Sequence, residues 1–212
     1  MRSTVLLTPF LAGCALMGGL RGSGVQKTET RSIGAFKRIE LIGAGEVNVS
    51  VGATSDLKLE IDDNLAEYIT TEIEGDALVI RNKRNISSTI GPRIRVGAER
   101  LQAITISGSG KVKAMGISAK AFDATISGSG SITLEGKTDQ LHAAINGSGA
   151  IDAERLEAGT AEVSIRGSGS ALVDAMGALS VSISGSGSVL YAGNPAKIEQ
   201  SITGSGTIGR KQ

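Results

Sequence analysis

Few residues of this 212-residue chain have the types and spacing that chemistry requires. His142 is the only histidine, and a serine hydrolase would need it near a Gly-x-Ser-x-Gly turn, which the sequence lacks. We therefore expect a surface histidine. Asp62-Asp63 could offer oxygen ligands to Ca²⁺, but adjacent carboxylates lack the alternate spacing of calcium loops, which favours a solvated turn and leaves a cation site open. The sequence predicts no catalytic, cofactor-binding or metal-ligating residues.

Cys14 is the one residue with a definite chemical assignment. It is the only cysteine, and it follows Arg2 and a short apolar stretch at residues 5–11. Leu11-Ala12-Gly13-Cys14 resembles the lipobox of bacterial lipoproteins, which needs small residues before the cleaved bond and a thiol to alkylate. We predict a signal peptide at residues 1–13 and lipid attachment at Cys14. An ordinary signal peptide that happens to contain this cysteine is the alternative.

The residues after Cys14 predict where the anchored chain goes. Ala15 is not the acidic residue that retains lipoproteins at the inner membrane of enteric-like bacteria, so the lipoprotein rule implies the outer membrane, on its periplasmic or surface face. No other stretch is long enough to span a bilayer. Residues 14–32 contain Gly22-Ser23-Gly24 without a preceding isoleucine, which predicts a flexible lipidated tether. Without Arg2 the chain has 21 basic and 21 acidic residues (22 minus one, against 21), which argues against nucleic-acid binding.

The rest of the chain is organised by a repeated Ile-x-Gly-Ser-Gly sequence. Apolar and polar side chains alternate around each copy, which is typical of a β-strand with one buried and one exposed face. A flexible Gly/Ser linker has no reason to keep isoleucine in register, so repeats at a period near 19 residues predict a solenoid. The first glycines of the six copies are Gly108, Gly128, Gly147, Gly167, Gly185 and Gly204.

Coils of this length have room for two or three short strands joined by tight turns. We predict an all-β fold, a single-stranded parallel β-helix with coils of about 19 residues, right-handed by analogy with parallel crossover connections. The isoleucines, for example Ile126 and Ile145, should form a buried spine, and the motif serines an outer ladder of hydroxyl groups. Residues 33–209 should form one domain, with an irregular β part at 33–100 that caps the repeats of 101–209.

The order of the motifs resembles a known family. Phe36-x-x-Ile39-x-Leu41-x-Gly-x-Gly-x-Val47 is followed by Leu57-x-Leu59-x-Ile61-Asp62-Asp63-Asn64, by Gly75-Asp76-x-Leu78-x-Ile80, and by the tandem Ile-x-Gly-Ser-Gly copies. Over residues 31–209 this order resembles the bacterial auto-transporter adhesins with a head GIN domain. The resemblance implies a β-helical fold and a secreted or envelope location, and it brings no catalytic residues.

These observations predict a cell-envelope lipoprotein that acts as a non-catalytic binding, adhesion or structural module. Its partners would be the membrane, through the lipid anchor, and envelope polysaccharide, a host surface or a second copy of itself. A β-helix carbohydrate-processing enzyme is one alternative, but it needs clustered carboxylates beside an aromatic-lined groove, and aromatic residues make up 2% of this chain. A periplasmic accessory lipoprotein is the other alternative. No cofactor is expected.

Overall fold

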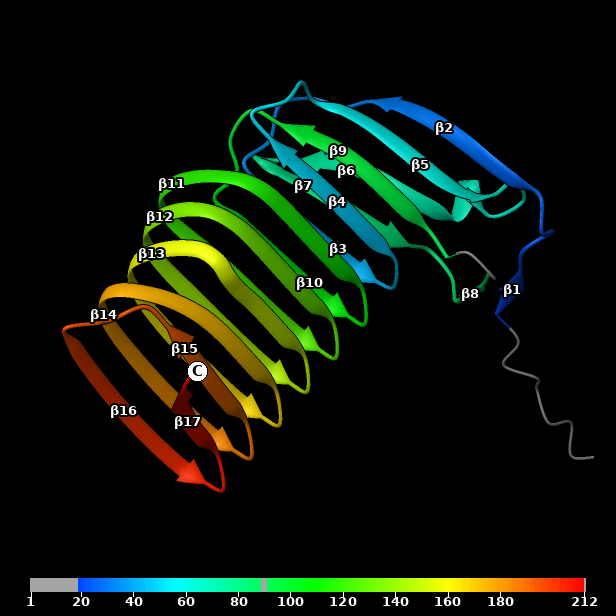
Figure 1. The fold of residues 1–212 in the computed structure, drawn as a ribbon. Coiled ribbons are helices and arrows are strands. Elements are labelled where there is room, and N and C mark those ends of the chain that lie inside the picture. Colours follow the sequence, from blue (N-terminus) through cyan, green and yellow to red (C-terminus); the bar gives the residue numbers. More distant parts are fainter. Residues whose placement is uncertain (1–18, 89–90, 212) are drawn as a thin grey trace, which may run out of the picture.

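The computed structural model describes residues 19–88 and 91–211. Cys14, the predicted signal peptide and the first residues of the predicted tether lie outside the described residues. In the described part the chain is built almost entirely of β-strands, wound into a solenoid (Figure 1). One turn of 3₁₀ helix, η1 (Ala66–Tyr68), interrupts them. Among these residues no helix has the length and apolar character needed to cross a membrane.

The strands divide into an N-terminal set and a repeat set. The N-terminal set is β1 (Leu20–Arg21), β2 (Gln26–Ser32), β3 (Arg38–Gly43), β4 (Glu46–Val51), β5 (Asp56–Asp62), β6 (Ile69–Glu74), β7 (Ala77–Asn82), β8 (Ile86–Ser87) and β9 (Arg93–Ala98). The repeat set is β10 (Ala103–Gly108), β11 (Lys111–Gly128), β12 (Ser131–Gly147), β13 (Ala150–Gly167), β14 (Ser170–Gly185), β15 (Ser188–Ala192), β16 (Lys197–Gly204) and β17 (Thr207–Arg210).

Each long strand of the repeat set bends from one sheet of the solenoid into the other. The first half of β11 pairs in parallel with β4, and its second half pairs in parallel with β10. The same division continues to the last coil, where β14 pairs with β15 through its first half and with β16 through its second. The chain therefore makes two facing sheets. We call the one that contains β10 and β16 the first sheet, and the one that contains β4 and β17 the second sheet.

The isoleucines of the repeat stack in register, as the alternation predicted. Ile126 pairs with Ile106 on one side and with Ile145 on the other. Ile126 and Ile145 are 0% and 1% exposed, so they belong to the continuous core between the two sheets. The motif serines, such as Ser129, are exposed and form the predicted ladder along one corner of the solenoid. The predicted parallel β-helix is confirmed.

Glycine is required at this corner because successive coils approach closely. At the first glycine of the motif the backbone has a positive φ, 130° at Gly147, and an added Cβ would lie 2.4 Å from the carbonyl oxygen of Gly128. At the second glycine, Gly149, an added Cβ would lie 2.7 Å from Cγ2 of Ile126. The close approach lets the Ser148 N–H donate a 2.9 Å hydrogen bond to the Gly128 carbonyl.

The N-terminal set extends the stack and then closes it. β3 and β4 pair in parallel with β7 and β9, which adds two looser coils to the regular ones. Beyond them the pairing becomes antiparallel, with β6 on β7 in the first sheet and β5 on β9, then β2 on β5, in the second. This irregular end lies in the part of the chain where the sequence predicts a cap. Its strands lie at the far end of the molecule from β16 and β17 (Figure 1).

The ordered domain begins earlier than the boundary expected at residue 33. β2 (Gln26–Ser32) lies within the segment expected to be a tether, and it pairs along its whole length with β5. It is ordered because it supplies backbone hydrogen bonds to an otherwise open sheet edge. The Arg31 guanidinium also donates to the Ile69 and Ala66 carbonyls, at 2.6 and 3.1 Å.

The in-register spine makes a testable prediction about stability. Ile126→Asp should destabilise the fold by about 2–5 kcal/mol or more, because it removes buried apolar area and buries a charge without a partner. Ser129→Asp, three residues along in the same coil, should have a much smaller effect because the side chain is exposed. Chemical denaturation followed by circular dichroism measures both. Coinciding unfolding curves for the two variants would contradict the assignment of inner and outer faces.

Candidate binding surface

The outer side of the first sheet carries two columns of mostly small polar side chains, one on either side of the buried isoleucines. Strands lie about 4.8 Å apart in a sheet, so each column repeats its groups at that spacing. We call these two columns the hydroxyl face. One column is Thr105, Thr125, Ala144, Ser164, Ser182 and Ser201, and the other is Ser107, Ser127, Asn146, Arg166, Ser184 and Thr203.

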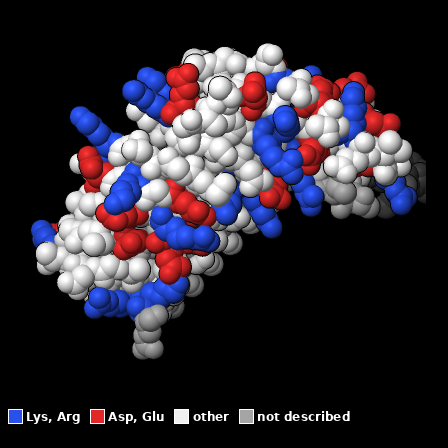
Figure 2. All heavy atoms as spheres, turned by 45° about the horizontal axis from the view of Figure 1, so that its top comes forward, with Lys and Arg blue, Asp and Glu red and all other residues white. Residues whose placement is uncertain are grey.

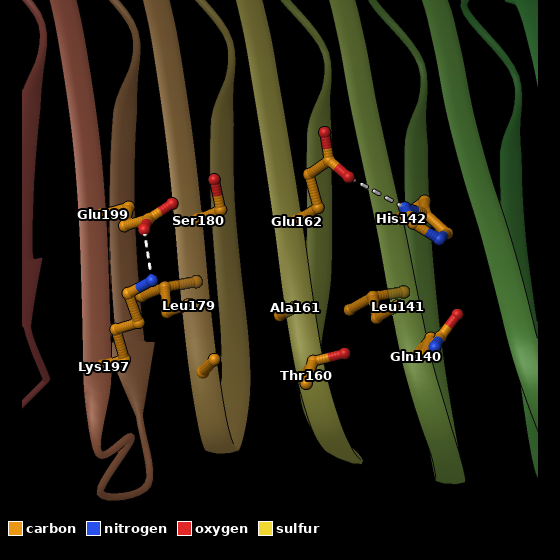
Figure 3. Close-up of a pocket in the computed structure, with 11 residues that line it drawn as sticks. Gln140, Leu141, His142, Thr160, Ala161, Glu162, Leu179, Ser180, Lys197 and Glu199 are labelled. Atoms are coloured by element: carbon orange, nitrogen blue, oxygen red, sulfur yellow. Dashed lines mark ion pairs between the residues drawn. The ribbon is translucent and has the colours of Figure 1, made fainter.

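A shallow hollow of about 310 Å³ lies beside the hydroxyl face and crosses four strands (Figure 3). It forms because short side chains, Thr160 and Ala178, stand between the longer Gln140 and Lys197 in one row of paired residues. The next outward row contains His142, Glu162, Ser180 and Glu199. Between these two rows lies a buried row that includes Leu141 and Leu179, each 1% exposed.

The charged groups at the hollow are already paired with one another. His142 Nδ1 lies 3.2 Å from Glu162 Oε2, and Lys197 Nζ lies 2.5 Å from Glu199 Oε1. The hydrogen bond from Lys197 lowers the pKa of Glu199, and the same bond raises the pKa of Lys197. Both pairs are exposed, so they contribute little to stability. The hollow is thus lined by these paired side chains, by the polar side chains of Gln140, Thr160 and Ser180, and by aliphatic side chains such as Leu141 and Leu179.

The arrangement around His142 does not form a hydrolase triad. Glu162 stands in the strand between His142 and Ser180, whereas a triad needs the histidine between the serine and the acid. His142 is exposed on the surface, as expected from the sequence. Across residues 19–88 and 91–211, no group of three or more His, Cys, Asp or Glu residues is arranged to hold a metal ion.

Asp62 does not lie in a solvated turn, which corrects the expectation for the Asp62-Asp63 pair. The Asp62 side chain is buried, and it accepts hydrogen bonds from the Gly24 N–H at 2.7 Å and from the Ser88 hydroxyl. Asp63 is exposed and accepts from the Ser23 hydroxyl and the Asn64 N–H. The two carboxylates thus hold the Gly22–Gly24 segment against the end of β5. No local pattern predicts these contacts, because Ser23 lies 40 residues from Asp63 and Gly24 lies 38 residues from Asp62 along the chain.

The outer side of the second sheet is charged and mixed in sign. Glu135 lies 3.2 Å from Lys113 and 3.4 Å from Arg155, so one carboxylate bridges two cations on neighbouring coils. At the bend between the sheets, Lys137 and Glu157 form a further pair at 3.2 Å. Figure 2 shows positive and negative side chains interspersed over the face in view. Such a surface has no strong field of one sign to attract a polyanion.

Asp174 is a carboxylate whose environment opposes its ionised form. Its Oδ1 is buried without a hydrogen-bond partner. Burial raises the pKa of Asp174, and the negative charges of Glu157 and Glu154 raise it further. An aspartate whose pKa is raised on folding lowers the stability of the fold once the pH exceeds the pKa of the unfolded chain, about 4.

Asp174→Asn should therefore raise the melting temperature near pH 7. The gain should shrink as the pH falls toward about 3, where Asp174 binds a proton in both the folded and the unfolded chain. Thermal unfolding of both proteins across this range measures the effect. Asp152→Asn, at an exposed position of the preceding coil, is the matched control and should show a smaller change. A gain that is equal at both ends of the range would contradict the electrostatic explanation.

Comparison with known proteins agrees with the fold. A solved structure from Bacteroides fragilis, described as a putative adhesin, is 22% identical with a TM-score of 0.73, and the match covers 91% of this chain and 100% of that one. A putative adhesin from Parabacteroides merdae is 20% identical with a TM-score of 0.59, covering 91% and 99%. A structure from Parabacteroides distasonis, described as a putative lipid binding protein, is 26% identical with a TM-score of 0.52, covering 91% and 99%.

No curated protein matches the chain. The family model described as "Putative auto-transporter adhesin, head GIN domain" matches residues 35–195, which include both looser coils and the repeat set from β10 to β15. The match covers most of the chain and agrees with the motif order and with the solenoid. The chain belongs to the head GIN domain family of auto-transporter adhesins.

Proposed function

We propose that this protein is a lipid-anchored adhesive module of the cell envelope, which works by contact and not by turnover. The observation that carries the proposal is the hydroxyl face, in which Ser, Thr or Asn occupies ten of the twelve positions over six paired strands, the exceptions being Ala144 and Arg166. A repeated surface favours many weak, identical contacts over one deep site. The family name and the adhesin-named structures support an extracellular or envelope location.

The chemistry of the face favours a hydroxyl-rich polymer as its ligand, such as an envelope or host polysaccharide. Serine, threonine and asparagine side chains donate and accept hydrogen bonds, so they can exchange bonds with sugar hydroxyl groups. The hydroxyl face has no aromatic side chain to act as an anchor, so each contact is expected to be weak. Affinity would then come from the number of contacts made at once.

The hollow gives less support to a carbohydrate-processing enzyme. Glycoside hydrolysis needs two carboxylates facing one bond, one of them a proton donor with a raised pKa. The two carboxylates at the hollow, Glu162 and Glu199, are each paired with a basic group, and the pKa of Glu199 is lowered. A periplasmic accessory role would use the same anchor, and protease treatment of intact cells distinguishes it from a surface role.

Lipidation at Cys14 is the first test. Cells that express the protein should incorporate labelled palmitate into it, because the thiol of Cys14 is alkylated after cleavage of the signal peptide. Cys14→Ser should remove the label and release the protein from the membrane fraction. Equal labelling of the two proteins would exclude Cys14 as the attachment site.

Multivalent binding is the second test. Protein immobilised on beads should bind envelope polysaccharide or cells, whereas the same protein as a monomer should bind roughly tenfold less or weaker still. Ser127→Glu combined with Ser184→Glu places two charges on the hydroxyl face and should reduce bead binding. Ser129→Glu combined with Ser186→Glu places the same charges on the serine ladder of the same coils and should have little effect.

Two results would overturn this function. The first is equal binding by both double variants, which would separate adhesion from the hydroxyl face. The second is the release of cleaved saccharide by the monomeric protein, which would favour the enzyme. Circular dichroism of both variants checks that the substitutions leave the fold intact.

A further inference from the structure

The two ends of the solenoid differ in how their outermost strands are paired and in which side chains those strands carry. At the N-terminal end the parallel stack is closed by antiparallel strands, and the outermost strands β2 and β6 carry charged side chains such as Lys27, Glu29 and Glu72. Charged edge strands resist pairing with another chain. At the other end, β16 and β17 are each hydrogen-bonded on one side only, to β14 and β15, within the described residues. Their outer edges offer unpaired N–H and C=O groups.

The last coil also exposes the apolar side chains that other coils bury. Ile198 and Ile202 are each 41% exposed, although their counterparts in the preceding coil, Leu179 and Ile183, are each 1% exposed. The difference arises because a coil is covered by the next coil, and the described chain supplies none beyond β16. Within the described residues this end is therefore an apolar edge that a further strand can cover.

Gln200, which lies between these two isoleucines, indicates what kind of strand covers the edge. Gln200 occupies an inward position at which the other five copies of the repeat have aliphatic residues: Ile104, Ala124, Ala143, Val163 and Val181. An aliphatic residue there would suit a following coil of the same kind. A glutamine suits a partner that presents another amide, because the two side chains can each donate and accept a hydrogen bond.

We propose that β16 pairs antiparallel with β16 of a second copy, with the two Gln200 residues opposite each other at a two-fold axis. In this register Ile198 faces Ile202 of the second copy, and Ile202 faces its Ile198. Residues opposite each other in an antiparallel pair point to the same side of the sheet, so all four isoleucines turn inward together. On the outer side, Lys197 faces Thr203 and Glu199 faces Ser201, so no like charges meet.

The same axis joins both sheets of the solenoid. A two-fold axis that passes through both sheets, perpendicular to the solenoid axis, brings β16 against β16 and β17 against β17. Both sheets then continue from one copy into the other, and no open edge is left between them. Head-to-tail stacking, which would build fibres, would instead place β16 against the charged antiparallel strands of the capped end. The closed dimer is favoured for this reason.

This contact is made by the backbone edge and the inward side chains of β16, at the end of the molecule. It meets the hydroxyl face only at Ser201 and Thr203, and the other five strands of that face stay free for the proposed adhesion to polysaccharide. In one copy the capped end lies opposite β16 and β17 (Figure 1), so this pairing places the two capped ends at opposite ends of the dimer. If both copies are anchored through Cys14, as proposed above, the dimer bridges two facing membranes.

Sedimentation equilibrium of purified Cys14→Ser protein tests the pairing. The protein should show a monomer–dimer equilibrium. Gln200→Lys should raise the dissociation constant roughly tenfold or more, because two like charges then meet at the axis. Ser201→Lys is the matched control: it adds the same charge one residue along, opposite Glu199 of the second copy, and the dimer should persist. A protein that stays monomeric at all concentrations, or a dimer that Gln200→Lys leaves undiminished, would overturn the proposal.

Cross-linking tests the register itself. The Cys14→Ser chain has no other cysteine, so Gln200→Cys adds a single thiol. Directly opposite residues of an antiparallel pair have Cα atoms about 4.5–5.5 Å apart, which a disulfide can span. Mild oxidation should therefore give a covalent dimer. Ser201→Cys should not cross-link, because its own copy lies displaced along the strand. Cross-linking of Ser201→Cys in preference to Gln200→Cys would refute this register, whatever the outcome of the polysaccharide assay.

Discussion

The close approach of each coil to the next at the Ile-x-Gly-Ser-Gly corner is the constraint on which the rest of the structure depends. A Cβ at the first glycine would lie 2.4–2.5 Å from a carbonyl oxygen of the preceding coil in all six copies. That closeness lets the serine N–H bond to the same carbonyl, at 2.9 Å from Ser129 onward. With the corners fixed, the strand segments next to them stack in register, which places every isoleucine directly over the previous one, and the register shifts lie farther away, near the bend between the sheets.

The same constraint explains why the repeat region could be predicted from the sequence. Because a strand's side chains alternate with a period of two, fixing one corner decides which residues of that coil point inward. The prediction fails where the strand has not yet begun. Gln102 has an inward phase by spacing from Gly108, yet it is exposed and Leu101 is buried in its place, since β10 begins only at Ala103.

The N-terminal half was harder to predict because its contacts join distant residues. β5 runs antiparallel to β9 and β2, and its carboxylate Asp62 is satisfied by the Gly24 N–H and by Ser88. None of these pairings leaves a local pattern, so the sequence predicted strands there without their partners, and it predicted a tether where β2 lies. The hollow was missed for a related reason: its shape depends on the lengths of Gln140, Thr160, Ala178 and Lys197, which are neighbours only after the coils stack.

The hold of Asp62 and Asp63 on the Gly22–Gly24 segment has a mechanical consequence. Any tension applied to the chain from its N-terminal side reaches the two-residue pairing of β1 with β8 first, then this clamp, and only then the pairing of β2 with β5. The buried Asp62 side chain would lose its hydrogen bond from the Gly24 N–H as the clamp opens, and an unsatisfied buried polar group is costly, so the clamp resists the pull before β2 is loaded. Behind it, seven residues of β2 are paired with β5 and share the remaining load. Under such a pull the pairing of β1 with β8, the clamp and the pairing of β2 with β5 would break first. The coils that carry the hydroxyl face would still be folded at that point.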